Sequence, residues 1–362
     1  MTATVPLESR QPATRTERIP VAILGATGSV GQRFIQLLAN HPWFRVHELV
    51  ASDRSAGKSY GSAADWRLES LVPDEVARMT VQALGGELES RLVFSGLDSS
   101  VAGEAEDDYA NRGCAVISNS RNHRMDEDVP LLIPEVNADH LDAIAQQRRR
   151  RAGYIVTNPN CSVVGLAMAL APLERAFGIE AVQVTTMQAI SGAGFAGVAS
   201  YAILDNVIPY IGGGEEEKIE AEPRKILGRW SEGRFSDAPM KISAQVNRVP
   251  TIDGHLMTIA VKLRERAELA AVREAIESFS GEPQRLGLPT APKHALHYVD
   301  AGDRPQPRLD RDREGGMAVS IGRLRPCPIL DYRLVALVHN TIRGAAGAAI
   351  LNAELLEAKG ML

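Results

Sequence analysis

Cysteine is scarce in this chain of 362 residues, which contains only Cys114, Cys161 and Cys327. The number is odd and no CxxC pair occurs, which argues against a disulfide framework and against a structural zinc site. Unpaired cysteines fit a reducing compartment. We therefore expect a cytoplasmic protein without a metal.

Long apolar runs and an excess of basic residues are also missing. No run of 18 apolar residues occurs, so we predict no membrane span. Residues 1–18 are polar and lack the apolar centre of a secretory signal, and we expect them to form a mobile tail. The net charge of -5 gives no basic footprint for nucleic acid, although a local pocket can still hold an anionic small molecule.

The first apolar run, Ile19–Leu24, has the length of a strand and leads directly into a glycine-rich turn. Apolar residues at helical spacing follow, and strand, glycine turn and helix are the context of a dinucleotide-binding loop. The spacing is GxxGxxG rather than GxGxxG, and a plain turn is the alternative. The residues expected to contact the cofactor here are Gly25, Thr27, Gly28, Ser29 and Val30.

The ends of the next two predicted strands offer further cofactor contacts. After the strand at residues 46–51, Ser52, Arg54 and Ser55 could surround a 2′-phosphate, which favours NADP. Asp53 argues against a phosphate site here, because its carboxylate would repel the 2′-phosphate. The alternative interpretation of these residues is a solvated charged loop. Ser95 ends the strand that starts at Arg91, where cofactor contacts collect in open α/β sheets.

Cys161 stands where a short strand, Tyr154–Thr157, passes through an Asn-Pro-Asn turn into a helix that reaches Phe177. Free backbone N–H groups and the positive end of the helix dipole favour a thiolate at this position. They would also hold an oxyanion formed beside the sulfur. A buried structural cysteine is the alternative, and position alone does not decide between the two.

Beyond this helix the pattern changes to an α+β half. Residues 181–190 alternate as a half-buried antiparallel strand does, and further strands are predicted at 241–250, from His255, at 315–322 and at 332–338. Arg248 and His255 flank one turn and could face one pocket. An Ala-rich helix begins at Asn340. We expect a cofactor domain at residues 19–160, completed by the helix 340–362, and a catalytic and dimerisation domain at 161–339.

Six motifs in one order resemble aspartate-β-semialdehyde dehydrogenase, most closely its fungal and archaeal branch, over about residues 19–358. They are Gly25-Ala-Thr-Gly-Ser-Val-Gly-Gln32, Ser120-Arg-Asn-His-Arg124, Asn158-Pro-Asn-Cys-Ser162, Gln188-Ala-Ile-Ser-Gly-Ala-Gly194, Glu215-Glu-Glu-Lys-Ile-Glu220 and Arg248-Val-Pro-Thr-Ile-Asp-Gly-His255.

The resemblance implies a Rossmann-type parallel-sheet domain that binds NADP and an α+β catalytic and dimerisation domain with a mainly antiparallel sheet. It implies the reversible reductive dephosphorylation of L-aspartyl-4-phosphate to L-aspartate-4-semialdehyde through a cysteine thioester, in the biosynthesis of lysine, threonine, methionine and isoleucine. The implied partners are the small substrate and inorganic phosphate, with a homodimer or homotetramer and neither nucleic acid nor membrane.

The same resemblance implies a role for individual residues. Cys161 would be the nucleophile, His255 the general acid/base, and Gln188 the residue that positions the acyl group. Substrate contacts fall on Arg248 for the carboxylate, Glu215 near the amine, Lys218 and Arg124 for the phosphate, and Asn160. Cofactor contacts fall on Ser191, Gly192 and Asn340.

Two other functions stay open from the sequence. The chain could be a relative that reduces malonyl-CoA or N-acetylglutamyl phosphate, although the latter family usually carries Asn-Pro-Gly-Cys where this chain has Asn-Pro-Asn-Cys. It could also be a catalytically silent NADP-binding sensor. Such a sensor would be expected to lose the cysteine or the histidine, and Cys161 and His255 are both present.

Overall fold

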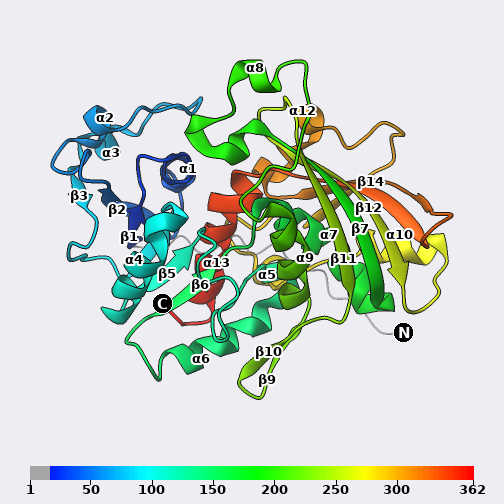
Figure 1. The fold of residues 1–362 in the computed structure, drawn as a ribbon. Helices are drawn as coiled ribbons and strands as arrows, with labels where there is room; N and C mark the ends of the chain where they lie inside the picture. The colour runs from blue at the N-terminus through cyan, green and yellow to red at the C-terminus, as the bar shows by residue number, and fades with distance from the viewer. Residues whose placement is uncertain (1–16) are drawn as a thin grey trace, which may run out of the picture.

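The computed structural model describes residues 17–362 and contains two large β-sheets with helices between and around them (Figure 1). Most of the tail expected at residues 1–18 therefore lies outside the described residues. Within the described part of the chain, no helix is both long and apolar enough to cross a membrane.

The first sheet has six parallel strands in the order β3-β2-β1-β4-β5-β6. This is the strand order of a dinucleotide-binding fold, which reverses direction between β1 and β4 and opens a crevice at the carboxyl ends of those strands. The expectation of a Rossmann-type parallel sheet is confirmed. The strands are β1 (Ile19–Leu24), β2 (Phe44–Ala51), β3 (Val81–Ala83), β4 (Leu92–Ser95), β5 (Ala115–Ser118) and β6 (Tyr154–Thr157).

The turn between β1 and helix α1 (Ser29–Leu38) requires glycine because the backbone is crowded there. Gly25 has a φ of 73°, and a Cβ on it would lie 2.7 Å from the carbonyl oxygen of Gly96. A Cβ on Gly31 would lie 2.3 Å from the carbonyl oxygen of Gly25. These close approaches bring the helix N-terminus against the end of β4, where the crevice opens.

The second sheet is mixed and mostly antiparallel, in the order β13-β14-β15-β12-β7-β11-β8. The pairs β7–β11 and β13–β14 are parallel, and the other four pairs are antiparallel. The expected mainly antiparallel sheet is thus confirmed. Its strands are β7 (Ile179–Gln188), β8 (Ile208–Pro209), β11 (Lys241–Arg248), β12 (His255–Leu263), β13 (Leu296–Val299), β14 (Val319–Pro326) and β15 (Tyr332–Val338).

Helix α7 (Cys161–Phe177) has the predicted bounds, and Gly178 follows it as the C-cap residue. It is apolar on all sides, and every residue from Ser162 to Leu173 is buried, which is the pattern of a helix enclosed within a core. Its side chains share a core with the second sheet. A Cβ on Gly165 would lie 2.8 Å from Cγ1 of Val338, so this glycine lets the helix lie directly on β15.

The remaining elements connect and cover the sheets (Figure 1). They are α2 (Tyr60–Ala63), α3 (Asp74–Arg78), α4 (Ser99–Asn111), α5 (Pro134–Asn137), η1 (Ala138–Ala143), α6 (Ile144–Gln147), η2 (Ile190–Ala196), α8 (Ser200–Ile203), α9 (Glu215–Ile226), the hairpin of β9 (Arg229–Ser231) and β10 (Arg234–Ser236), α10 (Leu269–Glu277), α11 (Glu282–Leu286), α12 (Pro307–Asp310) and η3 (Arg313–Gly316).

Two sequence predictions of secondary structure were wrong in detail. The strand expected at 315–322 begins at Val319, because Gly315 and Gly316 have positive φ values that are incompatible with the extended backbone of a β-strand. The last helix does not start at Asn340 but after a π-helical turn, η4 (Ile342–Ala346), as α13 (Gly347–Ala358).

A buried ion pair joins the C-terminal segment to the first half of the chain. Nη2 of Arg343 in η4 lies 2.6 Å from Oε2 of Glu135 in α5, and both side chains are fully buried. The apolar residues of α13 belong to the same core as the first sheet. The pair therefore anchors the segment that completes this core.

We predict that Glu135→Ala lowers the free energy of unfolding by about 3–5 kcal/mol, because the Arg343 guanidinium would stay buried without a counter-charge. Denaturation by urea, monitored by circular dichroism, measures the change. The matched control is Glu180→Ala, which breaks the half-exposed pair between Glu180 and Lys262 and should cost less than about 1 kcal/mol. Equal losses in the two variants would contradict the anchoring role.

Candidate active site

The side chain of Asn160 caps helix α7 and so places Cys161 at its first position. Oδ1 of Asn160 accepts hydrogen bonds from the N–H groups of Ser162 at 2.9 Å and Val163 at 3.4 Å. Cys161 is partly exposed and lines a cavity of about 210 Å³. The turn before α7 follows β6, so the cysteine lies at the carboxyl edge of the first sheet.

His255, the first residue of β12, faces this cysteine. Its Nε2 lies 3.2 Å from Sγ of Cys161, and its Nδ1 accepts the N–H of Ala189 at 3.0 Å. Because a backbone N–H can donate only to an unprotonated nitrogen, the neutral ring carries its proton on Nε2. The ring therefore presents an N–H to the sulfur, the arrangement of a proton donor.

Electrostatics keep both groups neutral in this state. Burial, reinforced by the carboxylate of Glu215, raises the pKa of Cys161 to about 12. Burial, reinforced by the positive charge of Arg248 and by His339, lowers the pKa of His255 to about 3. The expected thiolate is therefore not favoured without a ligand, because burial outweighs the helix N-terminus. The N–H groups of Ser162 and Val163 are also engaged by Asn160, so they are not the free oxyanion donors that the sequence suggested.

Arg248 ends β11 and presents a buried guanidinium to the same site. Its Nη1 donates to the carbonyl oxygen of Ala189 at 2.6 Å, and its burial lowers the pKa against the opposing effects of Cys161 and Glu215. No carboxylate within residues 17–362 forms an ion pair with it. A Cβ on Gly192 would lie 2.8 Å from this Nη1 and 3.3 Å from Nε2 of His255, so glycine is required between them and the cavity.

Glu215 gathers three of the predicted site residues around one buried carboxylate. Oε1 accepts from Nδ2 of Asn160 at 2.8 Å and from Nε2 of Gln188 at 3.1 Å. Oε2 accepts from Nζ of Lys218 at 3.3 Å, one helical turn further along α9. Lys218 is the most exposed member of this group, with 22% of its side chain accessible.

Arg124 also lines the cavity, and its orientation depends on a residue that the sequence analysis did not single out. Its Nη1 lies 2.9 Å from Oε1 of Glu222, and Nη2 donates to the carbonyl oxygen of Asn119 at 2.9 Å. Oε2 of Glu222 also accepts the N–H of Asn160 at 2.7 Å. Glu222 lies two helical turns after Glu215 on the same face of α9, a spacing that could have identified it.

Several expected cofactor residues meet at this cavity. Ser29, Val30, Ser191, Gly192 and Asn340 line it. Nδ2 of Asn340 donates to Oγ of Ser191 at 2.8 Å, and its Oδ1 accepts the N–H of Gly254 at 2.8 Å.

The glycine turn lies immediately before these residues. Gly25, Thr27 and Gly28 form it, and Gly28 is the N-cap residue of α1 and donates its N–H to the carbonyl oxygen of Gly25 at 3.0 Å. A neighbouring cavity of about 420 Å³ shares Ser29, Ser191, Gly194 and Thr341 with the smaller one.

Other expected cofactor residues lie apart from the cavity. Ser52, Arg54 and Ser55 follow β2, where Ser52 and Arg54 are exposed to solvent. Ser95 is buried, and its hydroxyl donates to Oε1 of Glu106 at 2.5 Å. Burial raises the pKa of this carboxyl despite two serine hydrogen bonds. The Ser95 hydroxyl already donates its hydrogen to Glu106. The predicted contact of Ser95 with a cofactor therefore stays a prediction.

Comparison with known proteins identifies the family of the chain. The model of the semialdehyde dehydrogenase NAD-binding domain matches residues 20–144, and the model of the semialdehyde dehydrogenase dimerisation domain matches residues 170–343. The aspartate-semialdehyde dehydrogenase of Schizosaccharomyces pombe is 49% identical over 94% of this chain and 99% of its own length. That of Methanothermobacter thermautotrophicus is 49% identical over 93% of this chain and 99% of its own length.

Solved structures give the same result. The crystal structure of aspartate semialdehyde dehydrogenase with NADP from Candida albicans has a TM-score of 0.90 and 45% identity, and covers 95% of this chain and 100% of its own. That of aspartate semialdehyde dehydrogenase II complexed with ASA from Vibrio cholerae has a TM-score of 0.74 and 27% identity, and covers 95% of this chain and 99% of its own. With both family models and near full-length relatives in agreement, this chain belongs to the aspartate-semialdehyde dehydrogenase family.

Proposed function

We propose that the protein catalyses the NADP-dependent, reversible conversion of L-aspartyl-4-phosphate to L-aspartate-4-semialdehyde and phosphate in amino-acid biosynthesis. The observation that carries the proposal is the 3.2 Å contact between Sγ of Cys161 and Nε2 of His255, in a site where the guanidinium of Arg248 forms no ion pair within residues 17–362. A thiol nucleophile, a proton donor and a carboxylate receptor are the groups that acyl transfer from this substrate needs.

Cys161 is the nucleophile in this proposal. Its sulfur attacks the acyl phosphate, the carbon–oxygen bond to phosphate breaks, and a thioester remains on the enzyme. Cys161 must lose its proton first, and because Nε2 of His255 already carries one, the proton passes to the phosphate group of the substrate, which leaves with it. The positive charges of Lys218, Arg124 and Arg248 around the site favour the thiolate. Arg124 and Arg248 already act to lower the pKa of Cys161 against the effect of burial.

His255 is the proton donor. The N–H of Ala189 holds the ring so that Nε2–H points at the sulfur, which is where the thiohemiacetal oxyanion forms next to Cys161. Nε2–H donates a hydrogen bond to this oxyanion. When the oxyanion re-forms the carbonyl, the carbon–sulfur bond breaks, the aldehyde leaves, and the bonding electron pair stays on Cys161 as a thiolate to which Nε2–H then donates. Gln188 orients the acyl group in this proposal, and its side-chain amide is itself held by a hydrogen bond to Glu215.

The charged groups of the substrate match the charges of the site. Arg248 offers a planar fork to the α-carboxylate, and its lack of a carboxylate partner within the described residues supports this role. Glu215 receives the ammonium group, assisted by its position beside Asn160. Lys218 and Arg124 bind the phosphate, for which Glu222 holds Arg124 in place.

NADP is the cofactor, and the residues present fit it. Gly25, Gly28 and Gly31 leave the start of α1 bare for a pyrophosphate, and Gly192 leaves room over His255. When bound, the nicotinamide supplies the hydride for the thioester carbon. Ser191 and Asn340, which hydrogen bond to one another at 2.8 Å, would hold its carboxamide end against the cavity of Cys161.

The wider biological setting follows from the same proposal. The match to a dimerisation domain supports an oligomer, and we propose a homodimer or homotetramer built through the second half of the chain. The division into a cofactor domain at 19–160 with 340–362 and a catalytic domain at 161–339 belongs to the proposal, as does a cytoplasmic location. Neither malonyl-CoA reduction nor a silent sensor is favoured by the relatives described above.

We predict that the purified protein oxidises aspartate semialdehyde only when phosphate and NADP are both present, and that it does not reduce malonyl-CoA with NADPH. Absorbance of NADPH measures both reactions.

Cys161→Ser should lose more than about 99% of turnover, because a serine hydroxyl is far less ionised than a thiol, while its NADP affinity stays unchanged. A serine variant that keeps a tenth of the rate would remove Cys161 from the nucleophile role.

We predict that Arg248→Lys lowers kcat/KM for aspartate semialdehyde by on the order of a hundredfold although the charge is kept, because lysine cannot form the two-pronged contact that orients the reacting carbon. An aldehyde analogue without the carboxylate should lose little further activity in the variant. Steady-state kinetics of both proteins on both aldehydes test this, with thermal melts to check folding. Equal proportional losses on the two aldehydes would contradict the role of Arg248 as the carboxylate receptor, and Lys218 would be the next candidate.

Cofactor preference should depend on the exposed turn after β2. We predict that Arg54→Gln weakens NADP binding by about 1.5–3 kcal/mol, the range for a hydrogen bond to a charged group, and leaves NAD binding nearly unchanged. Fluorescence titration of the two cofactors provides the measurement, and Asp53→Asn is the neighbouring control, which should not weaken NADP. Parallel losses for NAD and NADP in Arg54→Gln would exclude a 2′-phosphate contact.

A further inference from the structure

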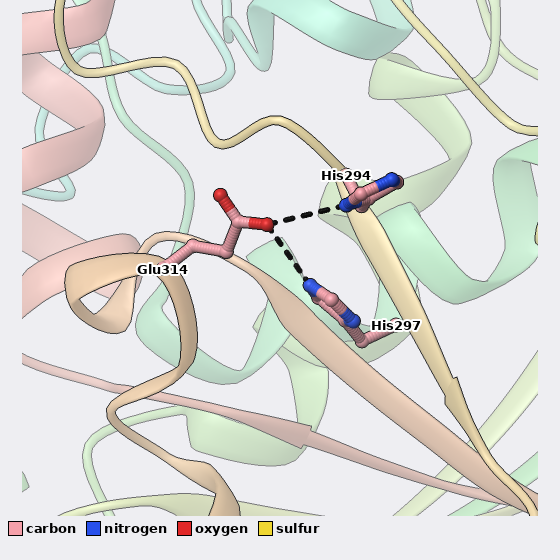
Figure 2. A group of neighbouring side chains, drawn as sticks. All are labelled: His294, His297 and Glu314. Atoms are coloured by element: carbon pink, nitrogen blue, oxygen red, sulfur yellow. Dashed lines mark hydrogen bonds and ion pairs between the residues drawn. The ribbon is translucent and has the colours of Figure 1, made fainter.

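A cluster of two imidazoles and one carboxylate lies outside the candidate active site (Figure 2). His294 precedes β13 and His297 lies within it, at one edge of the second sheet, while Glu314 belongs to η3. Oε1 of Glu314 lies 3.3 Å from Nδ1 of His294 and 3.0 Å from Nε2 of His297. All three ligand atoms lie within 4.8 Å of one another.

These separations are those of atoms that share a metal ion. Zinc–nitrogen and zinc–oxygen bonds of about 2.0–2.2 Å place neighbouring tetrahedral ligands roughly 3.3 Å apart. We propose that His294, His297 and Glu314 form a binding site for a divalent transition-metal ion of the zinc type. Two imidazoles favour such an ion over calcium or magnesium, which prefer oxygen ligands.

The carboxylate is held in place before any ion arrives. Oε2 of Glu314 accepts the N–H of Lys293 at 2.8 Å, which leaves Oε1 directed at the two rings, as Figure 2 shows. The backbone of Glu314 has a φ of 49°, a left-handed conformation that costs energy for a residue other than glycine. Conformations of this kind persist where the surrounding structure fixes them, and here the result is a preset ligand.

The charge of the cluster also suits a cation. The Glu314 carboxylate is the acidic group of the cluster and faces both imidazoles. Its neighbour Arg313 is paired with the buried Asp310 at 3.0 Å and so does not neutralise the carboxylate. His294 is 66% exposed, which leaves open positions for water on the ion and a path for its entry.

Occupation of the site would restrain a segment that borders the candidate active site. The ion would join β13 to η3, and η3 packs on the chain at Asn340. A Cβ on Gly316 would lie 3.0 Å from Cδ1 of Ile342 and 3.2 Å from Cδ2 of His339, which shows how closely the turn meets this segment. The ion would therefore stabilise the folded protein by binding it in preference to the unfolded chain.

Titration of Zn²⁺ into the tag-free, chelator-treated full chain tests the site, measured by isothermal titration calorimetry and by the shift in Tm. We expect one ion per chain and a higher Tm. His297→Ala and the conservative Glu314→Gln should each weaken binding at least about tenfold and abolish the shift. His47→Ala is the matched control, since His47 pairs with Glu89 at 2.9 Å but has no second imidazole, and it should bind as the original protein does.

A second measurement separates this site from the thiols. Co²⁺ bound by imidazole and carboxylate should give visible absorption without a sulfur-to-metal charge-transfer band, and should do so equally in Cys161→Ser. Binding that vanishes in Cys161→Ser but survives in Glu314→Gln would assign the ion to the catalytic pair and overturn the proposal. Absence of binding to the original protein would also overturn it and leave a hydrogen-bonded triad.

Discussion

The hydrogen bonds of Asn160 are the constraint on which the arrangement of the site depends. Its Oδ1 caps α7, its Nδ2 donates to Glu215, and its backbone N–H donates to Glu222. One residue thus sets the start of the helix that carries Cys161 and fixes α9 against it. Because β6 of the first sheet ends just before this residue, the same contacts hold the cofactor half and the catalytic half in register.

Burial sets the charge state of the proposed catalytic pair. It opposes charge on both Cys161 and His255, so the thiolate–imidazolium ion pair common to reactive cysteines is not favoured without a ligand. Burial of the surrounding groups also strengthens each electrostatic contact that an anionic substrate makes in the site. Reactivity then depends on what the site binds rather than on the helix terminus alone.

Local patterns in the sequence were sufficient for the elements that carry chemistry. The strand Ile19–Leu24, the glycine turn and the helix Cys161–Phe177 are continuous stretches, so periodicity and turn residues define them. Contacts between distant segments were not accessible in this way. The Ala189 N–H that sets the tautomer of His255 is a backbone group without a signature, and the three residues of the imidazole–carboxylate cluster meet only through the pairing of β13 with β14. The small number of cysteines argued against a structural zinc site, but it gives no information on a site built from imidazole and carboxylate ligands.

The return of the C-terminal segment to the first sheet has a consequence for biogenesis. Residues from Ile342 to Leu356 supply apolar side chains to the core of a domain whose strands lie between Ile19 and Thr157. During synthesis the amino-terminal part emerges first, at about 5–20 residues per second, and must wait for the last helix before its core can close. The sheet of the nucleotide-binding half is thus translated first, and its core closes only after α13 has been made.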